Sequence, residues 1–331
     1  MSTTAHDIYG ATPTAAPATP GSYGQPPHGY RLPDATRLGP VRLQVADLAR
    51  SLAFYEHVLG LTQLASSPDG ATLGSPGSHD GDSSAAPLVE LVERPGARPM
   101  AARGRLGLYH VAILLPDRPA LGRFVRHLAA EGVRAGAGDH LVSEAFYLTD
   151  PDGLGIEVYA DRPRETWQRL GRELMLATDP VNVPDLVRAA GPIPWTGMPS
   201  GTAIGHVHLH VDSTEQAGAF FSEALGFDRM TWRYPGALFM GAGGYHHHLG
   251  TNTWAGAGAR PPAPDDARLL EWTIELPDVA AVDGAATSLA RAGHPVARAA
   301  ATEVSVHDPW GTAVRLRVAP PDATTLGAGT A

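Results

Sequence analysis

Residues 147–157 read YLTDPDGLGIE, and residues 305–315 read SVHDPWGTAVR. Both stretches contain Asp-Pro-X-Gly, which is typical of a tight turn between two strands because proline and glycine supply the backbone angles that such a turn requires. Four residues after the turn glycine the copies differ, with Glu157 in the first and Arg315 in the second. The duplicated turn indicates a repeated architecture, and the single surviving carboxylate indicates that one copy keeps a site.

Further repeats lie upstream of the two turns. Residues 40–45 and 206–211 are alternating segments 166 positions apart, and each leads into a helix-like segment that ends in Leu-Gly. Residues 110–117 and 271–278 match in the same way at an offset of 161. Each repeat predicts one strand, one helix and then two or three strands. The four predicted modules span residues 38–95, 106–161, 203–254 and 268–319.

The modules divide the chain into a predicted N-terminal domain, residues 38–161, and a predicted C-terminal domain, residues 201–319. Residues 162–200 are expected to form a connector with a helical first half and a proline-rich second half. Residues 1–37 are rich in alanine, threonine, proline and glycine and lack periodicity, so they are predicted to be a disordered tail. Residues 320–331 are expected to form a second tail.

The composition excludes several classes of function. The net charge is −9 and the pI is about 5.9, and no basic stripe is present, so nucleic acid is not an expected partner. No apolar run approaches the roughly 20 residues that span a membrane, and no leader segment is expected at the start. The chain has no cysteine, which excludes disulfides and thiolate metal sites, and the reducing cytoplasm is the expected location.

Four modules of this kind resemble the vicinal oxygen chelate superfamily, which includes glyoxalases, bleomycin resistance proteins and extradiol dioxygenases. Over residues 38–319 the motifs are most similar to those of the two-domain extradiol enzymes of the catechol-2,3-dioxygenase kind. The resemblance implies an α+β fold in which four βαβββ modules form two paired, open-barrel-like domains.

The same resemblance implies an activity. An enzyme of this kind opens a catechol-type aromatic diol with O2 at a non-heme Fe(II), and Mn(II) is the alternative ion because it accepts the same donors. Catechol, a substituted catechol and a hydroquinone all stay open as substrates. Edge strands in this superfamily often pair between chains, so a homo-oligomer stays open as well.

In this superfamily the metal ligands lie at the start of a module's first strand and on its last strand. The first-strand position is held, in module order, by Pro40, His110, His206 and Glu271. The resemblance therefore implies that His110, His206 and Glu157 bind the metal, since two imidazoles and one carboxylate are typical of a non-heme iron site with open positions. This site requires the second module to face the third. Pairing of the first module with the second would divide the three ligands.

The histidine run at residues 246–248 is expected on the last strand of the third module, where the extradiol enzymes carry an acid-base histidine. The register of the following Leu-Gly assigns that role to His247, with His246 beside it, and the choice within the run stays open by one residue. Alternation turns His246 and His248 to the face opposite His247.

Other candidates surround the expected metal. Tyr147 precedes Glu157 by ten residues, the step found between tyrosine and ligand in the extradiol enzymes, and Tyr147 and His140 are candidates for holding substrate hydroxyls. The residues expected to line the substrate pocket are His208, His248, Asn252 and Trp254.

Two other functions compete with the dioxygenase. A metal-dependent isomerase or lyase of the glyoxalase kind would add a second carboxylate or a glutamine as fourth ligand, whereas that position here falls on the histidine run. A ligand-binding protein without turnover, like the drug-resistance members of the superfamily, would lack the three ligands. Metal content separates the binding protein from both enzymes.

Overall fold

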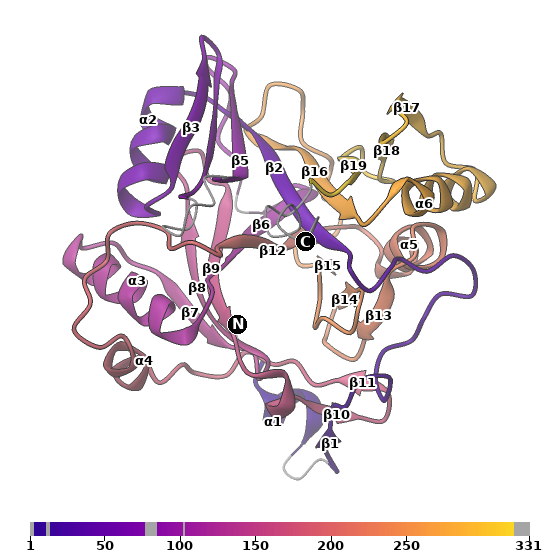
Figure 1. Cartoon of the computed structure of the whole chain (residues 1–331), viewed down its shortest axis with the longest axis horizontal. Helices are drawn as coiled ribbons and strands as arrows, with labels where there is room; N and C mark the ends of the chain where they lie inside the picture. The colour runs from indigo at the N-terminus through magenta and orange to yellow at the C-terminus, as the bar shows by residue number, and fades with distance from the viewer. Residues whose placement is uncertain (1–2, 11–13, 77–84, 102, 321–331) are drawn as a thin grey trace, which may run out of the picture.

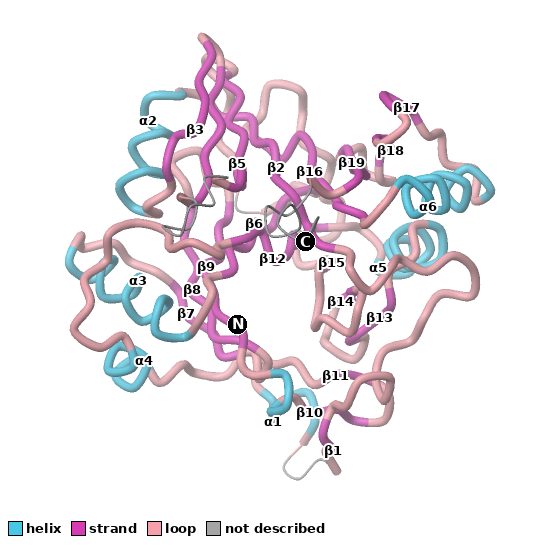
Figure 2. Tube along the Cα trace, viewed as in Figure 1, coloured by secondary structure: helices cyan, strands magenta, loops and turns pink. Residues whose placement is uncertain are grey.

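The computed structural model describes residues 3–10, 14–76, 85–101 and 103–320, and one strand, one helix and three strands follow each other four times in it (Figures 1 and 2). The first module consists of β2 (Arg37–Val45), α2 (Leu48–Ala53) continued as a π-helix over Phe54–Val58, β3 (Thr62–Ser67), β4 (Gly70–Ser75) and β5 (Ala86–Glu93). The second consists of β6 (Gly107–Leu114), α3 (Arg118–Ala130), β7 (Gly136–Asp139), β8 (Ser143–Thr149) and β9 (Gly155–Asp161).

The third and fourth modules repeat this order. The third consists of β12 (Ala203–His210), α5 (Thr214–Ala217) continued as a π-helix over Gly218–Ala224, β13 (Asp228–Thr231), β14 (Ala237–Gly241) and β15 (Leu249–Asn252). The fourth consists of β16 (Arg268–Leu276), α6 (Val279–Arg291), β17 (Ala297–Ala300), β18 (Glu303–His307) and β19 (Ala313–Val318).

The modules pair through their first strands into two eight-stranded sheets. Sheet 1 has the order β13-β14-β15-β12-β6-β9-β8-β7, and sheet 2 has the order β17-β18-β19-β16-β2-β5-β4-β3. The central neighbours are antiparallel in both, β12 with β6 and β16 with β2. The second module therefore lies beside the third and the first beside the fourth, across the predicted boundary between residues 38–161 and 201–319. The expected α+β class with four modules in two paired half-barrels is confirmed.

Short polar side chains start the helix of each module. In every case the side chain accepts a hydrogen bond from the backbone N–H three residues later, which satisfies one of the donors that a helix leaves unpaired at its start. The four capping residues are Asp47, Asp117, Ser213 and Asp278.

The two Asp-Pro turns have the same internal hydrogen bonds. Oδ1 of Asp150 accepts from the backbone N–H of Asp152 at 2.9 Å and of Leu154 at 2.8 Å. Oδ1 of Asp308 accepts from the N–H groups two and four residues later, both at 2.9 Å. Local sequence therefore builds the turn in both modules, whatever stands on the following strand.

One continuous core of buried apolar side chains joins the two sheets and their helices. α3 contributes Leu121, Phe124 and Leu128, which are spaced by three and four residues and therefore share one helix face. From sheet 2, Trp272 on β16 is fully buried in the same core.

The expectation of a disordered tail over residues 1–37 is corrected for the described part of that stretch. α1 (Ala5–Tyr9) is followed by β1 (Ala16–Pro17), which forms a small sheet with β10 (Gln168–Leu170) and β11 (Glu173–Leu174). The hydroxyl of Tyr9 donates to the carbonyl of Leu176 at 3.0 Å, 167 positions away. Composition could not reveal this order because the segment is held by the connector and has no core of its own.

The prediction that the first half of the connector is helical is wrong. Apart from the short 3-10 helix Arg164–Thr166, the first half forms the β10–β11 hairpin, whose turn contains Gly171 at a φ of 64°. The connector helix α4 (Val183–Ala189) lies in the second half and packs beside α3 (Figure 1). The predicted tail at 320–331 lies outside the described residues apart from Pro320. None of the helices in the described ranges has the length and apolar character of a membrane span.

Candidate metal centre

Three adjacent strands of sheet 1 carry His110, His206 and Glu157. On β12, His206 lies opposite Ala112 of β6, and on β9, Glu157 lies beside the same alanine. His110 stands two residues before Ala112 on β6. Directly opposed residues, and residues two apart on one strand, point to the same face of a sheet. The register of sheet 1 therefore directs the three side chains to one face.

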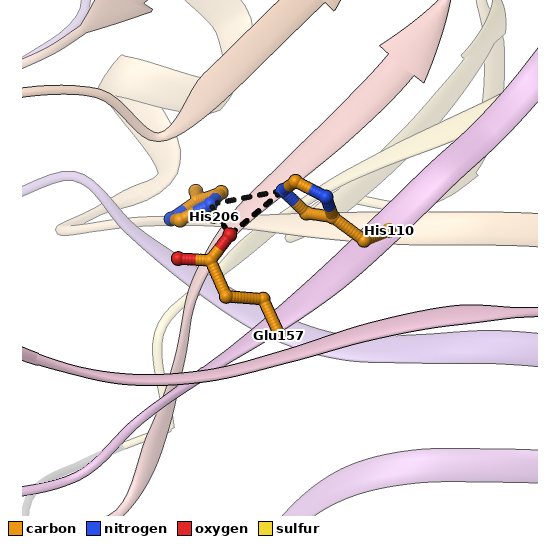
Figure 3. Close-up of side chains that lie close together, drawn as sticks. All are labelled: His110, Glu157 and His206. Carbon is orange, nitrogen blue, oxygen red and sulfur yellow. Dashed lines mark hydrogen bonds and ion pairs between the residues drawn. The ribbon is translucent and has the colours of Figure 1, made fainter. Parts of the chain in front are cut away.

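The three candidate ligand atoms converge (Figure 3). Nε2 of His110 lies 3.0 Å from Oε2 of Glu157, and Nε2 of His206 lies 3.3 Å from the same oxygen. The two Nε2 atoms are 3.3 Å apart, and all three side chains are buried. Within the described ranges this is the one group of three or more His, Cys, Asp or Glu residues whose ligand atoms lie within 4.8 Å of one another.

The donor set fits a divalent cation. Metal bonds of about 2.1 Å at right angles place neighbouring donor atoms about 3 Å apart, which agrees with the separations in the cluster. Oε1 of Glu157 and Nδ1 of His206 are buried and have no hydrogen-bond partner among the described residues. Buried polar atoms without partners cost free energy, and a cation bound by the Glu157 carboxylate would offset that cost at its Oε1.

Protonation in the cluster favours metal binding. Burial acts to raise the pKa of the Glu157 carboxyl, but His206 and His110 together outweigh burial and hold that pKa well below its usual range. Burial lowers the pKa of His206 to about 4, against the opposing effect of Glu157. A carboxylate beside a neutral imidazole is the state in which these side chains bind a metal.

The histidine run does not lie on the last strand of the third module, as expected, but in the loop that leads into β15. His247 turns to the three candidate ligands, and its ring centroid lies 4.2 Å from that of His206. His246 lies behind it, with the two Nδ1 atoms 2.7 Å apart. Nδ1 of His248 accepts from the backbone N–H of Ala242 at 3.2 Å, so this side chain belongs to the loop.

Tyr147 and His140 form a pair on the second module. The Tyr147 hydroxyl and Nε2 of His140 are hydrogen-bonded, and Nδ1 of His140 donates to the carbonyl of Ala177 at 2.6 Å. Because Nδ1 carries the imidazole proton, Nε2 accepts from the phenol. Burial, with the nearby Glu157, raises the pKa of Tyr147 well above its usual value, which keeps the phenol neutral.

Asn252 forms hydrogen bonds with two histidines and with the backbone of Trp254. Its Nδ2 donates to Nε2 of His208 at 2.9 Å, and its Oδ1 accepts from Nδ1 of His210 at 2.7 Å and from the backbone N–H of Trp254 at 3.0 Å. The ring centroid of His208 lies 4.9 Å from that of His110. The amide therefore fixes the orientation of a histidine that packs against a candidate ligand.

A cavity of about 870 Å³ opens onto the cluster. The predicted residues that line it are His110, Glu157, His206, His247, His140, Tyr147, His208 and Trp254. Three residues that were predicted for the site are not among the described residues that line the cavity: His246, His248 and Asn252.

An aromatic wall of the cavity was not predicted. The ring centroid of Tyr109 lies 4.9 Å from that of His110 and 5.7 Å from that of Trp254. Tyr234 continues the wall, 5.9 Å from Trp254 and 5.7 Å from Phe239. Tyr109 directly precedes a candidate ligand, which is a weak sequence signal. Tyr234 lies in the loop between β13 and β14, where no periodic pattern marks it.

Known proteins share this architecture. The model of the Glyoxalase/Bleomycin resistance protein/Dioxygenase superfamily matches residues 37–158. A Bacillus subtilis (strain 168) protein named catechol-2,3-dioxygenase is 44% identical over 266 residues, which cover 79% of this chain and 90% of the relative. The chain belongs to this superfamily. The resemblance inferred from the repeats is confirmed.

Solved structures agree on the fold. A proposed dioxygenase from Bacillus subtilis subsp. subtilis str. 168 superposes with a TM-score of 0.60 at 12% identity, over 88% of this chain and 87% of the other. Glyoxalase I from Zea mays superposes with a TM-score of 0.51 at 19% identity, over 86% of this chain and 92% of the other. At these identities the likeness shows the fold alone.

Proposed function

We propose that this superfamily member is an extradiol ring-cleaving dioxygenase, which opens a catechol-type aromatic diol with O2 at a non-heme Fe(II) bound by His110, His206 and Glu157. The observation that carries the proposal is the convergence of three buried ligand atoms, 3.0 to 3.3 Å apart, in the wall of a large cavity. The 44% identity to the Bacillus subtilis catechol-2,3-dioxygenase supports the same activity.

The ligand count favours this chemistry over that of an isomerase. His110, His206 and Glu157 would hold the ion with three donors and would leave open positions for the diol and O2. Among the described residues that line the cavity, Glu157 is the only carboxylate and there is no glutamine, so the fourth ligand of a glyoxalase-type site has no candidate. Fe(II) in this site would hold both reactants and carry electrons between them. Mn(II) is the alternative ion.

His247 is placed to take the proton of a substrate hydroxyl. It lines the cavity beside the candidate ligand His206. Burial, followed by the effect of His206, lowers the pKa of His247 well below its usual range, so the imidazole is neutral and can accept a proton when the diol binds. The same ring can return the proton to a product oxygen, as a general acid-base group does.

Tyr147 and the aromatic wall would position the ring of the diol. A phenol that stays neutral acts as a fixed hydrogen-bonding group and not as a base, and its contact with His140 fixes its direction. Tyr109, Phe239 and Trp254 offer aromatic surface to a flat substrate and exclude water from the reacting oxygens.

Oxygen uptake with catechol tests the proposal directly. Full-length protein reconstituted anaerobically with Fe(II) is expected to consume O2 and form a yellow ring-fission product. Glu157→Ala should lose more than about 99% of this uptake, because a lost ligand weakens metal binding as well as catalysis. Glu271→Ala removes a carboxylate from sheet 2 and is the matched control, with uptake retained.

The failures of this test point in different directions. Protein that binds one iron per chain but consumes no O2 with catechol or hydroquinone would contradict the dioxygenase and favour the isomerase or lyase. Protein that binds no divalent metal would contradict the metal site itself.

A further inference from the structure

A chain of three hydrogen-bonded side chains runs from the protein surface to the cavity. Asp161 is the last residue of β9, and its carboxylate is 27% exposed. Its Oδ1 lies 2.8 Å from Nε2 of His246, which is completely buried. Nδ1 of His246 lies 2.7 Å from Nδ1 of His247, and His247 lines the cavity.

The acceptor at one end of this chain determines where the protons lie. A carboxylate can only accept a hydrogen bond, so Nε2 of His246 carries a proton. When each ring holds a single proton, Nδ1 of His246 is the acceptor, and the proton between the two rings belongs to Nδ1 of His247. Nε2 of His247 consequently carries none, and it has no hydrogen-bond partner among the described residues.

We infer that Asp161 is a positioning residue which, through His246, fixes the tautomer of His247 and presents an unprotonated Nε2 to the cavity. The catalytic meaning rests on the proposed function, because an unprotonated Nε2 is what a base needs to receive the hydroxyl proton of a diol. The tautomer itself rests only on the three hydrogen-bonded groups. In metal centres and catalytic triads alike, a carboxylate behind an imidazole selects the reactive nitrogen.

The surroundings hold this chain in place. The Tyr245 hydroxyl donates to the same oxygen of Asp161 at 3.3 Å and shares a hydrogen bond of 2.7 Å with the Tyr159 hydroxyl. The ring of His246 packs 4.1 Å from Tyr245 and 5.4 Å from Trp167, measured between ring centroids. These contacts restrict rotation of the His246 ring, so its two nitrogens keep their partners.

The tautomers can be observed without turnover. Long-range 1H–15N correlation spectra of the full-length protein, labelled with 15N-histidine, report which ring nitrogen carries the proton. The spectra are recorded metal-free and with diamagnetic Zn(II), and His246→Gln and His247→Gln identify the signals among the 15 histidines. The expected result is a proton on Nδ1 of His247 and on Nε2 of His246. A His247 protonated on Nε2 would overturn the inference.

Two variants test the part played by the carboxylate. Asp161→Ala removes the acceptor, and His247 is expected to become a mixture of tautomers with Nε2 partly protonated. Tyr245→Phe removes the second hydrogen bond to Asp161 and the hydrogen bond to the Tyr159 hydroxyl, but it leaves the contact between Asp161 and His246 in place. This variant should leave both tautomers unchanged. An unaltered His247 signal in Asp161→Ala would show that the carboxylate does not set the tautomer.

Kinetics provides an independent readout in the Fe(II)-loaded protein. Asp161→Ala is expected to lower kcat for catechol by about 10- to 100-fold, the usual effect of removing a group behind a reactive one, with KM changed by less than about threefold. Asp161→Asn keeps a carbonyl acceptor and should recover most of the rate. A raised KM with unchanged kcat would contradict the inference. Absence of O2 uptake by wild-type protein with the expected tautomers would instead contradict the dioxygenase alone.

Discussion

Sheet 1 and sheet 2 have the same strand order, yet they fill equivalent positions with different chemistry. In sheet 1, His110 and Glu157 face a cavity, and no lysine or arginine among the described residues forms an ion pair with Glu157. In sheet 2 the same module positions hold Glu271 and Arg315, whose side chains form an ion pair of 2.6 Å. The neighbouring Arg42 lies opposite Glu271 and within 4.0 Å of Glu90.

The difference shows how one fold can either bring candidate metal ligands together or replace them with an ion pair. Arginine brings its own positive charge, so the carboxylates of sheet 2 are neutralised within the protein. Glu157 of sheet 1 has no arginine partner among the described residues, and its Oε1 is buried without a hydrogen-bond partner. The superfamily scaffold is the same in both sheets, and the residues at two equivalent positions determine whether the carboxylate is paired with arginine.

The largest expected effect is on metal affinity. Glu157→Gln should weaken binding of Fe(II) or Mn(II) by more than about 100-fold, because it removes the negative charge from a buried donor set. Glu271→Gln should leave the affinity unchanged within about twofold. Titration calorimetry under anaerobic conditions measures both, and equal losses in the two variants would contradict the assignment of the site to sheet 1.

Equivalent glycines in the two sheets extend the comparison to protein stability. A Cβ at Gly205 would lie 1.8 Å from the Tyr159 hydroxyl, which is buried, whereas a Cβ at the equivalent Gly39 would lie 2.9 Å from Oε1 of Glu275. Gly205→Ala should therefore lower the free energy of unfolding by about 2–3 kcal/mol, the upper part of the range of about 1–3 kcal/mol for overpacking of a core. Gly39→Ala should cost less by at least about 1 kcal/mol. Urea denaturation tests the order, and the reverse order would contradict it.

The two Asp-Pro turns should make similar pH-dependent contributions to stability, although the strands beside them carry different side chains. Burial raises the pKa of Asp150 and of Asp308 to about 6 from the usual 3.8 of an aspartate. A raised carboxyl pKa stabilises the folded state below about pH 4, and this stability is lost as the pH rises through about 6. Each group should remove at most about 3 kcal/mol between pH 4 and pH 7.

Amide variants of the turns isolate that contribution. Asp150→Asn and Asp308→Asn keep the Oδ1 acceptor, so each should show a smaller decline in unfolding free energy between pH 4 and pH 7 than wild type. Urea denaturation at several pH values measures the difference. Identical pH profiles for a variant and the wild type would contradict the raised pKa at that turn.

The smallest expected effect concerns the ion pair of sheet 2. Arg315→Gln leaves Glu271 without its partner, and both side chains are partly exposed, at 27% and 17%. Such pairs contribute about 0–1 kcal/mol, so thermal unfolding should shift by only a few degrees and metal binding should not change. A loss above about 2 kcal/mol would show that the pair is a main support of sheet 2.

Much of the fold could be predicted because the repeats are long and their turns are local. The Asp150 turn and the module helix caps depend on residues two to four positions apart, which a sequence displays directly. The described part of residues 1–37 and the β10–β11 hairpin could not be predicted in this way. The first of these segments is held by hydrogen bonds to the connector, which is distant in sequence. The hairpin is local, but strands of three and two residues are too short to show a period.

The residues of the candidate site also divide into those that the sequence revealed and those that it did not. His110, His206 and Glu157 were identified because each stands at a repeated position, and the fold brings them together, while their role as ligands stays a prediction. The histidine run was placed on a strand because its neighbours alternate, but Gly243 and Gly244, both at positive φ, turn the chain into a loop there. Asp161 carried no sequence signal because its partner His246 lies on another module, and Tyr234 carried none because it lies in a loop without a periodic pattern.

The sequence by itself determined the four modules, the turn before the last strand of the second and fourth modules, and the three residues proposed as ligands. All of these follow from local patterns that repeat. Only the tertiary structure decided that the second module pairs with the third, since strand pairing depends on which apolar faces meet in the core. That pairing brings β12 beside β6 and so unites ligand positions 96 residues apart. It also brings Asp161 of the second module to His246 of the third, 85 residues away.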